Sequence, residues 1–432
     1  MKFSRKSAAL AAVLAGVLAA STACGGSDDD SASGDITLTV DTFGAFGYEE
    51  LFEQYEAAHP GVKIEHRNEK EHEKVYVPKL LQYLEAGSGA GDVVALEEGI
   101  LTSLRGQSDR FIDFNSYGGA ELESNFIKWK WDLGKSLDGS SLMALGTDVG
   151  GLAMCYRTDL FAKAGLPTAR DEVGKLWPTW ADYTATGEKF QGKVSGTKFV
   201  DGPAALFNAI LSQEAPKNGN YTYFDASDAY VADKNPAVKT AFDTVNSLKA
   251  KDLSAGLKSF TPEWQTGFKK DSFATMACPA WMLGVIKENS GDAYAGKWDV
   301  AAVPGGGGNW GGSYLAVPKQ SEHPEEAAEL AKFLTSPESQ ITAFKAVNAL
   351  PTSPQALKDP QVAEAKNDYF NDAPVGEIFA AGASSLQPVQ LGVKNVEVRT
   401  VFEDILIAIG QGKLSPADGW TKAIEDGRKK AE

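Results

Sequence analysis

The sequence predicts an α/β protein built from two lobes with a ligand cleft between them. Its 432 residues exceed what one hydrophobic core usually organises, so two domains are expected. Strand-like and helix-like segments alternate over the first part of the chain, which is the order of a mostly parallel sheet covered by helices. Later segments are placed to cross from one lobe to the other and back. Several crossings permit a hinge, and a hinge implies a cleft.

The N-terminal segment carries targeting information. Three cations among the first six residues precede an apolar run over residues 8–20, which is too short to span a bilayer. Residues 1–23 are therefore expected to be a secretory signal peptide. Small residues precede Cys24. Residues 24–35 contain no large apolar side chain that folding could bury, so this segment is expected to be a solvated tether. This arrangement resembles a bacterial lipobox, which implies lipidation of Cys24; ordinary secretion with Cys24 removed or unmodified is the alternative.

The next segments justify the α/β assignment. Short runs rich in β-branched residues predict strands, and apolar residues at helical spacing predict helices. Gly and Pro mark the boundaries between these elements. The expected order is strand 36–40, helix 48–58, strand 62–65, helix 73–86 and strand 92–96. Ligands of such sheets bind beyond the carboxyl ends of the strands. The segments that follow the strands, residues 41–46, 66–69 and 97–98, are therefore candidates for the site.

The rest of the chain is expected to enter the second lobe, rejoin the first near residue 300 and cross to the second again near residue 351. Strand-like residues 142–145 lead into a glycine-rich stretch and then into another strand over 152–156, which we interpret as a crossing. A helix-rich region over 159–273 precedes expected strands at 272–277, 298–303 and 314–317, and the last hundred residues are helical. The resulting expectation is residues 36–147 and 300–350 for the first lobe, and 148–299 and 351–432 for the second.

Composition restricts the partners. The chain has a formal net charge of −16, and the expected signal peptide carries three of its cations and no acid. Nucleic acid and anionic membrane surfaces are therefore not expected partners.

Two cysteines remain after the N-terminal segment. Cys155 and Cys278 each lie in or beside an apolar, strand-like run, and secretion would place them in an oxidising compartment. We hypothesise a disulfide between them, which would close a loop of roughly 120 residues. The alternative is two buried thiols.

Motifs for catalysis or metal binding are weak. The four histidines form no H-E-x-x-H motif and no i,i+4 pair, and no G-x-S-x-G motif occurs, so neither a metal nor a catalytic residue is expected. Residues 304–313 satisfy a G-x-G-x-x-G pattern, but a strand is expected after them where a dinucleotide site needs a helix, so no cofactor is expected. Carboxylate pairs for glycoside hydrolysis stay open, because many acids make chance pairs.

Aromatic side chains beside neutral polar ones indicate a sugar site. A pyranose ring has an apolar face that stacks on an indole, while its hydroxyl groups need donors and acceptors around it. The glycines around Trp310 would let the backbone come close to a ligand, with the flat indole of Trp310 against it. The alternative is a surface loop in which Trp310 is partly buried. Trp129 and Trp131 are expected to be structural.

Four sequence segments together resemble the extracellular sugar-binding lipoproteins of ABC importers, family 1 of the solute-binding proteins. The likeness covers essentially the whole chain after residue 23 and is greatest to the actinobacterial binders of cellobiose and cello-oligosaccharides. The segments are Asp92-Val93-Val94, Gly146-Thr147-Asp148, Cys278-Pro279-Ala280-Trp281-Met282 and residues 298–318, which include the run Ala-Val-Pro-Gly-Gly-Gly-Gly-Asn-Trp-Gly-Gly-Ser.

The resemblance implies a two-lobed periplasmic-binding-protein fold that closes on a neutral oligosaccharide without catalysis. It implies a monomer, anchored through Cys24 to the extracellular face of the membrane, that delivers the sugar to ABC permease subunits. Trp281 and Trp310 would be stacking platforms, and Glu97 and Asp148 hydroxyl acceptors. Lesser candidates from the same segments are Phe43, Phe46, Asn68, Glu69, Trp264 and Ser313. A secreted glycosidase, or a receptor of this fold for a peptide or metal, is the alternative.

Overall fold

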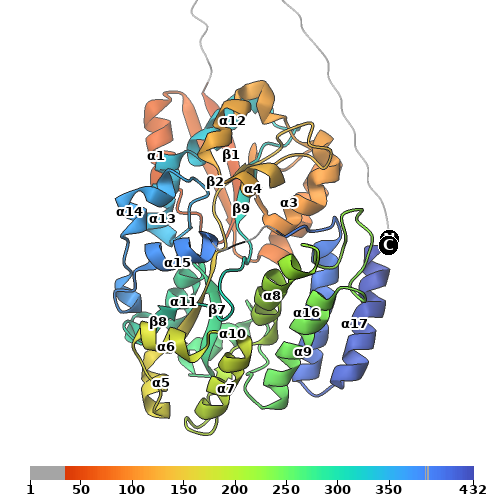
Figure 1. Ribbon diagram of the computed structural model, residues 1–432. Coiled ribbons are helices and arrows are strands. Elements are labelled where there is room, and N and C mark those ends of the chain that lie inside the picture. Colours follow the sequence, from red (N-terminus) through yellow and green to blue (C-terminus); the bar gives the residue numbers. More distant parts are fainter. Residues whose placement is uncertain (1–34, 385, 387–388) are drawn as a thin grey trace, which may run out of the picture. The chain divides into compact units, whose positions relative to one another are not determined.

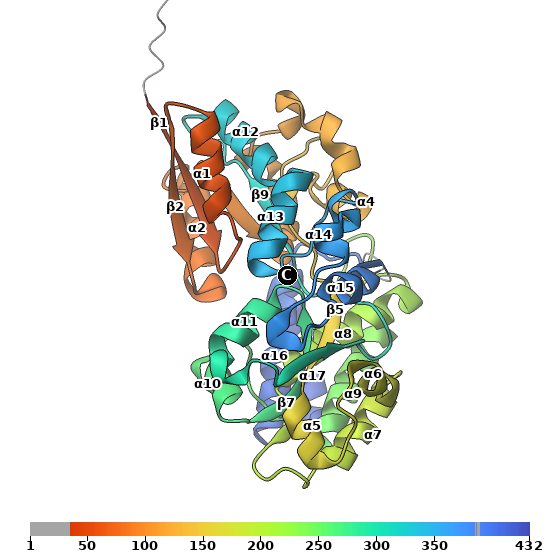
Figure 2. The same ribbon diagram turned by 90° about the vertical axis from the view of Figure 1, so that its left-hand side faces the viewer.

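The computed structural model describes residues 35–384, 386 and 389–432, and Asp35–Glu432 form one compact unit. This unit contains two separate sheets, each covered by helices, and we call each sheet with its helices a lobe (Figures 1 and 2). None of the described helices combines the length and the apolar character that crossing a bilayer would require.

The first lobe is built on a five-stranded sheet with strand order β2-β1-β3-β9-β4. Strand β1 pairs in parallel with β2 and β3, whereas β9 is antiparallel to both β3 and β4. The strands are β1 (Ile36–Phe43), β2 (Val62–Glu69), β3 (Val93–Glu97), β4 (Leu145–Gly146) and β9 (Ser313–Ala316). The helices around this sheet are α1 (Glu49–Ala58), α2 (Val77–Ala86), α3 (Glu98–Leu104), α4 (Lys128–Leu133), α12 (Pro324–Leu334) and α13 (Pro337–Val347) (Figures 1 and 2).

The second lobe is built on a four-stranded sheet with strand order β6-β7-β5-β8. Strand β5 (Leu152–Arg157) is antiparallel to β7 (Phe273–Pro279) and to β8 (Trp298–Ala301), and β6 (Lys198–Val200) is parallel to β7. The helices between residues 158 and 290 are α5 (Thr158–Ala164), α6 (Arg170–Leu176), α7 (Trp180–Phe190), α8 (Pro203–Glu214), α9 (Pro236–Ala250), α10 (Pro262–Lys269) and α11 (Met282–Ser290). The C-terminal helices are α14 (Pro360–Ala363), α15 (Val375–Ser384), α16 (Asn395–Gly410) and α17 (Pro416–Ala431).

Several expected strand limits differ from the structure, and two of them affect candidate site residues. The pairing of β1 with β2 continues to Phe43 and Glu69, because the two strands keep their parallel ladder beyond the β-rich residues. The candidate residues Phe43, Asn68 and Glu69 therefore lie within strands rather than after them.

The return to the first sheet comes later than residue 300. β8 is still part of the second sheet, and the loop after it is held there by hydrogen bonds from Gln213 Nε2 to the carbonyl oxygens of Pro304 and Gly307. The chain rejoins the first sheet only at β9. The physical reason is the antiparallel pairing of β8 with β5, which keeps the segment up to Ala301 in the second lobe.

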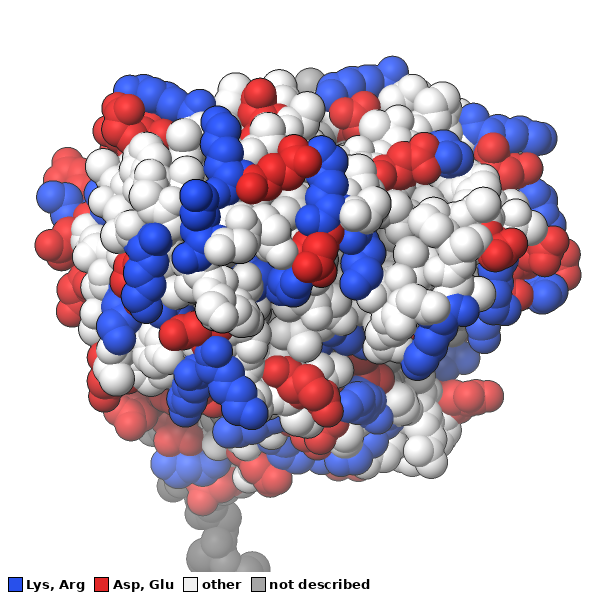
Figure 3. Space-filling model, turned by 90° about the horizontal axis from the view of Figure 1, so that it is seen from below, with Lys and Arg blue, Asp and Glu red and all other residues white. Residues whose placement is uncertain are grey.

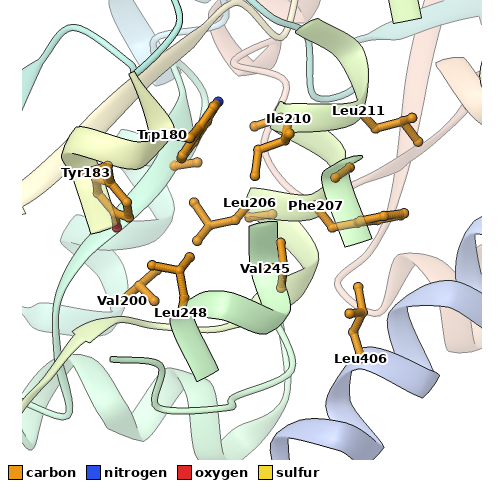
Figure 4. Packing of buried hydrophobic residues seen from close by; sticks show 14 of the residues in the cluster. Trp180, Tyr183, Val200, Leu206, Phe207, Ile210, Leu211, Val245, Leu248 and Leu406 are labelled. Carbon is orange, nitrogen blue, oxygen red and sulfur yellow. The ribbon is translucent and has the colours of Figure 1, made fainter. Parts of the chain in front are cut away.

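The largest core lies in the second lobe, where α8 packs against its neighbours (Figure 4). This helix is apolar on most of its surface, which is typical of a helix buried on all sides. Its side chains Leu206, Phe207, Ile210 and Leu211 are buried together with Leu406 of α16 (Figure 4). This core fixes α8 and α16, which both contribute to the site described below.

Hydroxyl side chains begin several helices, as their sequences would suggest. Each accepts a hydrogen bond from a backbone N–H of the first helical turn, which satisfies a donor that has no partner within the helix. These residues are Thr179 before α7, Thr261 before α10, Ser336 before α13 and Ser415 before α17.

A disulfide joins the two central strands of the second lobe. Cys155 of β5 and Cys278 of β7 have their Cα atoms 5.8 Å apart, and both residues are completely buried. Each lies in the ladder between these antiparallel strands, so the bond links segments that are 123 residues apart in the sequence.

Charges are mixed on the surface of the second lobe. The face seen from below in Figure 3 carries acidic and basic side chains side by side rather than one continuous basic patch. A polyanion finds no extended attractive surface on this face.

Candidate ligand-binding site

A cavity of about 690 Å³ lies between elements of the two lobes. Its volume is within the range of roughly 300 to 1,000 Å³ that small-molecule sites occupy. The first lobe contributes residues at both ends of α3 and on α4, and the second contributes α8, α16 and the loops near residues 216–223 and 386–391. The glycine-rich crossing segment, residues 305–311, forms a further part of the wall.

The backbone of Trp310, in the crossing segment, is held against Gly150, and its side chain lines the cavity. Trp310 donates its backbone N–H to the carbonyl oxygen of Gly150 at 2.9 Å. A Cβ atom on Gly150 would lie 2.2 Å from the carbonyl oxygen of Trp310, so this approach of two backbones requires glycine. The half-buried indole lines the cavity and contacts Trp281, with ring centroids 5.6 Å apart.

Three residues that line the cavity bury polar atoms without a hydrogen-bond partner among the described residues. They are the Tyr223 hydroxyl, Asn309 Oδ1 and Arg399 Nε. Leaving such an atom unpaired costs about 1–3 kcal/mol, so native structures usually satisfy it. The three buried atoms are a hydroxyl, an acceptor and a cationic donor.

The guanidinium of Arg399, on α16, lies close to the carboxylates of Glu403 and Glu73. Its Nε lies 3.7 Å from Glu403 Oε1, and its Nη2 lies 4.0 Å from Glu73 Oε1 of the first lobe. Burial disfavours the cation, but Glu403, Glu97 and Glu73 outweigh that effect and raise the pKa of the Arg399 guanidinium. The arginine therefore stays charged at this end of the cavity.

Glu98, which lines the cavity, forms an ion pair with the buried Lys130. Lys130 of α4 is fully buried, and its Nζ lies 3.3 Å from Glu98 Oε2 and 4.1 Å from the centroid of the Tyr314 ring. Asn309 Nδ2 donates to the other carboxylate oxygen of Glu98 at 2.9 Å. Burial raises the pKa of Glu98, and Lys130 opposes that rise.

Of the ten sequence-predicted ligand residues, Glu97 and Trp310 line the cavity. One oxygen of Glu97 is already used, because Oε2 accepts hydrogen bonds from the backbone N–H groups of Gly99 and Ile100 and so caps α3. Trp281 does not line the cavity, although it packs against the edge of Trp310.

Asp148 and Ser313 are buried where the chain crosses between the lobes, with the backbone N–H of Ser313 donating to Asp148 Oδ1 at 2.8 Å. Burial raises the pKa of Asp148. The two residues thus join the crossing segments rather than line the cavity.

Phe43, Phe46, Asn68 and Glu69 lie elsewhere in the first lobe. Phe43 packs on His72, with ring centroids 4.1 Å apart, and on Phe46 at 5.3 Å. Asn68 donates to the carbonyl oxygen of Gly44, and Glu69 pairs with Lys79. None of these four residues lines the cavity.

Trp264 is fully buried, and its Nε1–H donates to Asp201 Oδ2 at 2.8 Å. This partner explains its burial, because an indole N–H inside a core needs an acceptor. Trp264 is therefore part of the core of the second lobe.

The buried carboxyl of Asp201 predicts a pH-dependent stability. Burial raises its pKa to about 7, whereas the unfolded chain titrates near the ordinary value of about 3.9. The stabilisation is complete below pH 4 and is lost as the pH rises towards 7, a change of up to about 4 kcal/mol. Urea denaturation at a series of pH values should therefore show stability falling between about pH 4 and 7, and Asp201→Asn should flatten that fall. An unchanged slope in the variant would contradict this prediction.

Most cavity residues were missed by sequence reasoning, among them Trp129, Tyr223, Asn395 and Arg399. Trp129 was expected to be structural together with Trp131; Trp131 is 4% exposed in the core, but Trp129 lines the cavity. Asn395 and Arg399 lie one helical turn apart on α16, a spacing that also occurs on any solvated helix.

Within the described ranges, no group of three or more His, Cys, Asp or Glu side chains is placed to hold a metal ion.

Comparisons with known proteins identify the family. A family model described as bacterial extracellular solute-binding protein matches residues 50–370. The arabinooligosaccharide-binding protein of Bacillus subtilis (strain 168) is 26% identical over 330 residues, which is 72% of this chain and 71% of that protein. A second arabinooligosaccharide-binding protein, from Halalkalibacterium halodurans, is 24% identical over 59% of this chain, and the match spans just over half of its length, 56%.

Solved structures agree with this assignment. A crystal structure of an extracellular solute-binding protein of family 1 has a TM-score of 0.81 at 40% identity and covers 92% of this chain and 100% of that one. The ABC transporter associated binding protein from B. animalis subsp. lactis Bl-04, in complex with beta-1,6-galactobiose, shares the two-lobed fold with a TM-score of 0.76 at 23% identity, covering 91% and 98%. The chain therefore belongs to the bacterial extracellular solute-binding proteins, a family of binding proteins and not of enzymes.

Proposed function

We propose that this protein is the receptor of an ABC importer for a neutral oligosaccharide, with cellobiose or another β-linked disaccharide as its ligand. The observation that carries the proposal is one cavity lined by the indole of Trp310 together with the polar side chains of Tyr223, Asn309 and Arg399. The curated relatives that bind arabino-oligosaccharides support the ligand class.

The chemistry of a pyranose fits these groups. Its apolar C–H face covers an indole, and its hydroxyl groups can both donate and accept hydrogen bonds. A hydroxyl group bound at Arg399 would accept from Nε, whereas one bound at Asn309 would donate to Oδ1. Acidic and basic side chains line the cavity in equal number, which suits a neutral ligand; they are Glu97, Glu98, Asp132, Arg105, Lys217 and Arg399.

Transport needs a second partner. A relative named as a probable ABC transporter-binding protein, 29% identical over 244 residues, supports a membrane permease as that partner. The lobes would close on the sugar because the closed state makes more contacts with it than the open state. We propose that the protein acts as a monomer, which sedimentation of the sugar-bound protein would test.

Localisation is part of the proposal. Cys24 lies outside the described residues. Lipidation there would hold the receptor at the extracellular face of the membrane, within reach of the permease. Mass spectrometry of the N-terminal peptide tests this, because a peptide that begins with diacylated Cys24 is expected, and an unmodified N-terminus would contradict it.

Trp310→Ala should weaken sugar binding. Loss of aromatic stacking costs about 1–3 kcal/mol by analogy with bases stacked on aromatic rings, so the dissociation constant should rise about 5- to 150-fold in calorimetric titration. The matched control is Trp420→Ala, a half-buried tryptophan of α17 that does not line the cavity. Equal affinity of the Trp310 variant and the wild-type protein would remove this indole from the site.

A ligand panel tests the function itself. The mature protein would be unfolded thermally with cellobiose, xylobiose, an arabinobiose, β-1,6-galactobiose and maltose, and each sugar would be recovered afterwards. A sugar at a hundredfold excess over its dissociation constant adds about 2.7 kcal/mol of stability. Selective stabilisation by an intact β-linked disaccharide is expected. Stabilisation by none of the sugars would contradict the oligosaccharide assignment, and cleaved sugar would contradict binding without catalysis.

A further inference from the structure

Phe260 has a backbone conformation that is unusual for its residue type. Its φ angle is +65°, in the left-handed region, and the residue is 50% exposed. A bulky side chain with positive φ is an outlier, because its Cβ atom crowds the backbone. Among the described residues, every other non-glycine residue with positive φ is Asn or Asp, the types that tolerate this conformation. Local structure therefore gives no reason for an aromatic residue at this position.

Phe260 lies in a turn that leads directly into α10. The backbone N–H of Thr261 donates to the carbonyl oxygen of Lys258 at 3.3 Å, so Phe260 is the third residue of a four-residue turn. A turn with positive φ at its third residue favours Gly or Asn there. The side chain of Thr261 then caps α10 by accepting from the backbone N–H of Trp264. Strained residues that are fixed in this way cluster at ligand sites, which makes a functional role the hypothesis to test.

The ring of Phe260 is part of an accessible group of aromatic rings. Its centroid lies 5.4 Å from that of the fully buried Trp264, 6.3 Å from Trp281 and 6.4 Å from Trp310. Trp281 and Trp310 are half-buried, and the planes of Phe260 and Trp281 differ by 23°. We call Phe260, Trp281 and Trp310 the aromatic surface. It adjoins the cavity through Trp310, which lines it.

One edge of the aromatic surface lies near Glu73 of the first lobe. Lys258, two residues before Phe260, pairs with Asp404 at 2.6 Å. Burial lowers the pKa of the Lys258 ammonium, but Asp404 and then Glu73 outweigh that effect and raise it. The charge of Glu73 therefore acts on the turn that holds Phe260.

The other edge lies near the end of α13. Trp281 immediately precedes α11, and a Cβ atom on Gly284 in the first turn of that helix would lie 4.0 Å from the carbonyl oxygen of Val347. Val347 also lies beside Gly47, in the loop after β1. Figure 2 shows α10 and α11 below the part of the first lobe that contains β1, β2 and α2. The aromatic surface therefore lies where the second lobe meets the first.

We infer that the ring of Phe260 is a further stacking surface for the neutral oligosaccharide, next to Trp310. This inference rests on the proposed function and extends the site by a residue outside the cavity. The apolar face of a pyranose covers a flat ring, and a ring already held by its backbone and by Trp264 loses little entropy when a sugar stacks on it. The left-handed backbone has a role here, because it keeps half of the ring accessible instead of turning it into the core.

Calorimetric titration of the full-length mature protein with the five disaccharides of the panel tests this role. In Phe260→Asn the turn receives a residue that tolerates positive φ, so the protein should remain folded. Its dissociation constant for the bound sugar should rise about 5- to 150-fold, because the ring is lost. Phe260→Tyr keeps the ring and should bind as the wild-type protein does. Phe260→Leu keeps an apolar side chain without a flat face, so its affinity should fall as in Phe260→Asn.

Two results would overturn the stacking role of Phe260. One is wild-type affinity in Phe260→Asn, and the other is wild-type affinity in Phe260→Leu, since an apolar cover over Trp264 would then suffice. Leu81→Gln replaces an exposed apolar side chain of α2 that does not line the cavity, and this control should bind as the wild type does. Failure of the proposed function is distinct, because the wild-type protein itself would then bind none of the five sugars, and the role of Phe260 would fall with it.

Discussion

Breaking the disulfide between Cys155 and Cys278 should lower the free energy of unfolding by about 4–5 kcal/mol. The bond closes a loop of 123 residues, and in the chain-entropy model a loop of this size restricts the unfolded chain by that amount. The comparison is between oxidised protein and the same protein refolded under reductant, each unfolded in guanidinium chloride. Both samples have the same side chains, so packing differences are small.

Burial makes a second part of this prediction. Both cysteines are completely inaccessible to solvent, so reductant added to the folded protein should act only as fast as the second lobe opens. The double variant Cys155→Ala/Cys278→Ala is the control, and its stability should be indifferent to reductant. Titration of two thiols in the unfolded, unreduced wild-type protein would contradict the bond.

The two-lobed architecture follows from local patterns, which explains why the sequence could predict it. The strands that become β1, β3 and β7 are continuous β-rich runs bounded by polar or glycine-rich residues, and the helix beginning at Pro324 has a clear start. The exact lobe boundary did not follow. The segment that ends at Ala301 belongs to the second sheet because it pairs with β5, about 150 residues earlier, and such pairing leaves no local signal.

The site was predictable only where a single segment carries it. Trp310 stands in an unusual glycine-rich run, and Glu97 is the last residue of β3. Arg399 and Tyr223, by contrast, come from an ordinary helix and an ordinary loop that reach the cavity through the tertiary fold. Trp129 and Trp131 show the same limit, because deciding which of two nearby indoles faces a cavity requires the orientation of α4 in the lobe.

Lys130→Met should destabilise the protein by about 3–5 kcal/mol. The substitution leaves the Glu98 carboxylate buried without its cation, and an uncompensated buried charge costs that much. Lys128→Met is the matched control, because Lys128 lies two residues away on α4, is exposed and pairs with Asp132 at the surface. Urea denaturation should show no measurable change in the control.

The pH dependence and a double variant identify the cause of the loss. Without Lys130, burial and the nearby Glu97 are opposed only by the hydrogen bond from Asn309, so the pKa of Glu98 rises further. The stabilisation is then present at low pH and is lost as the pH rises. The deficit of Lys130→Met should therefore be smaller at pH 5 than at pH 8. Glu98→Gln/Lys130→Met removes both charges and keeps an acceptor for Asn309, so it should recover the part of the stability that Glu98 accounts for, while the buried Asp148 still lacks the nearby cation. A double variant as unstable as Lys130→Met would show that lost packing around Lys130, rather than the unpaired charge, causes the destabilisation.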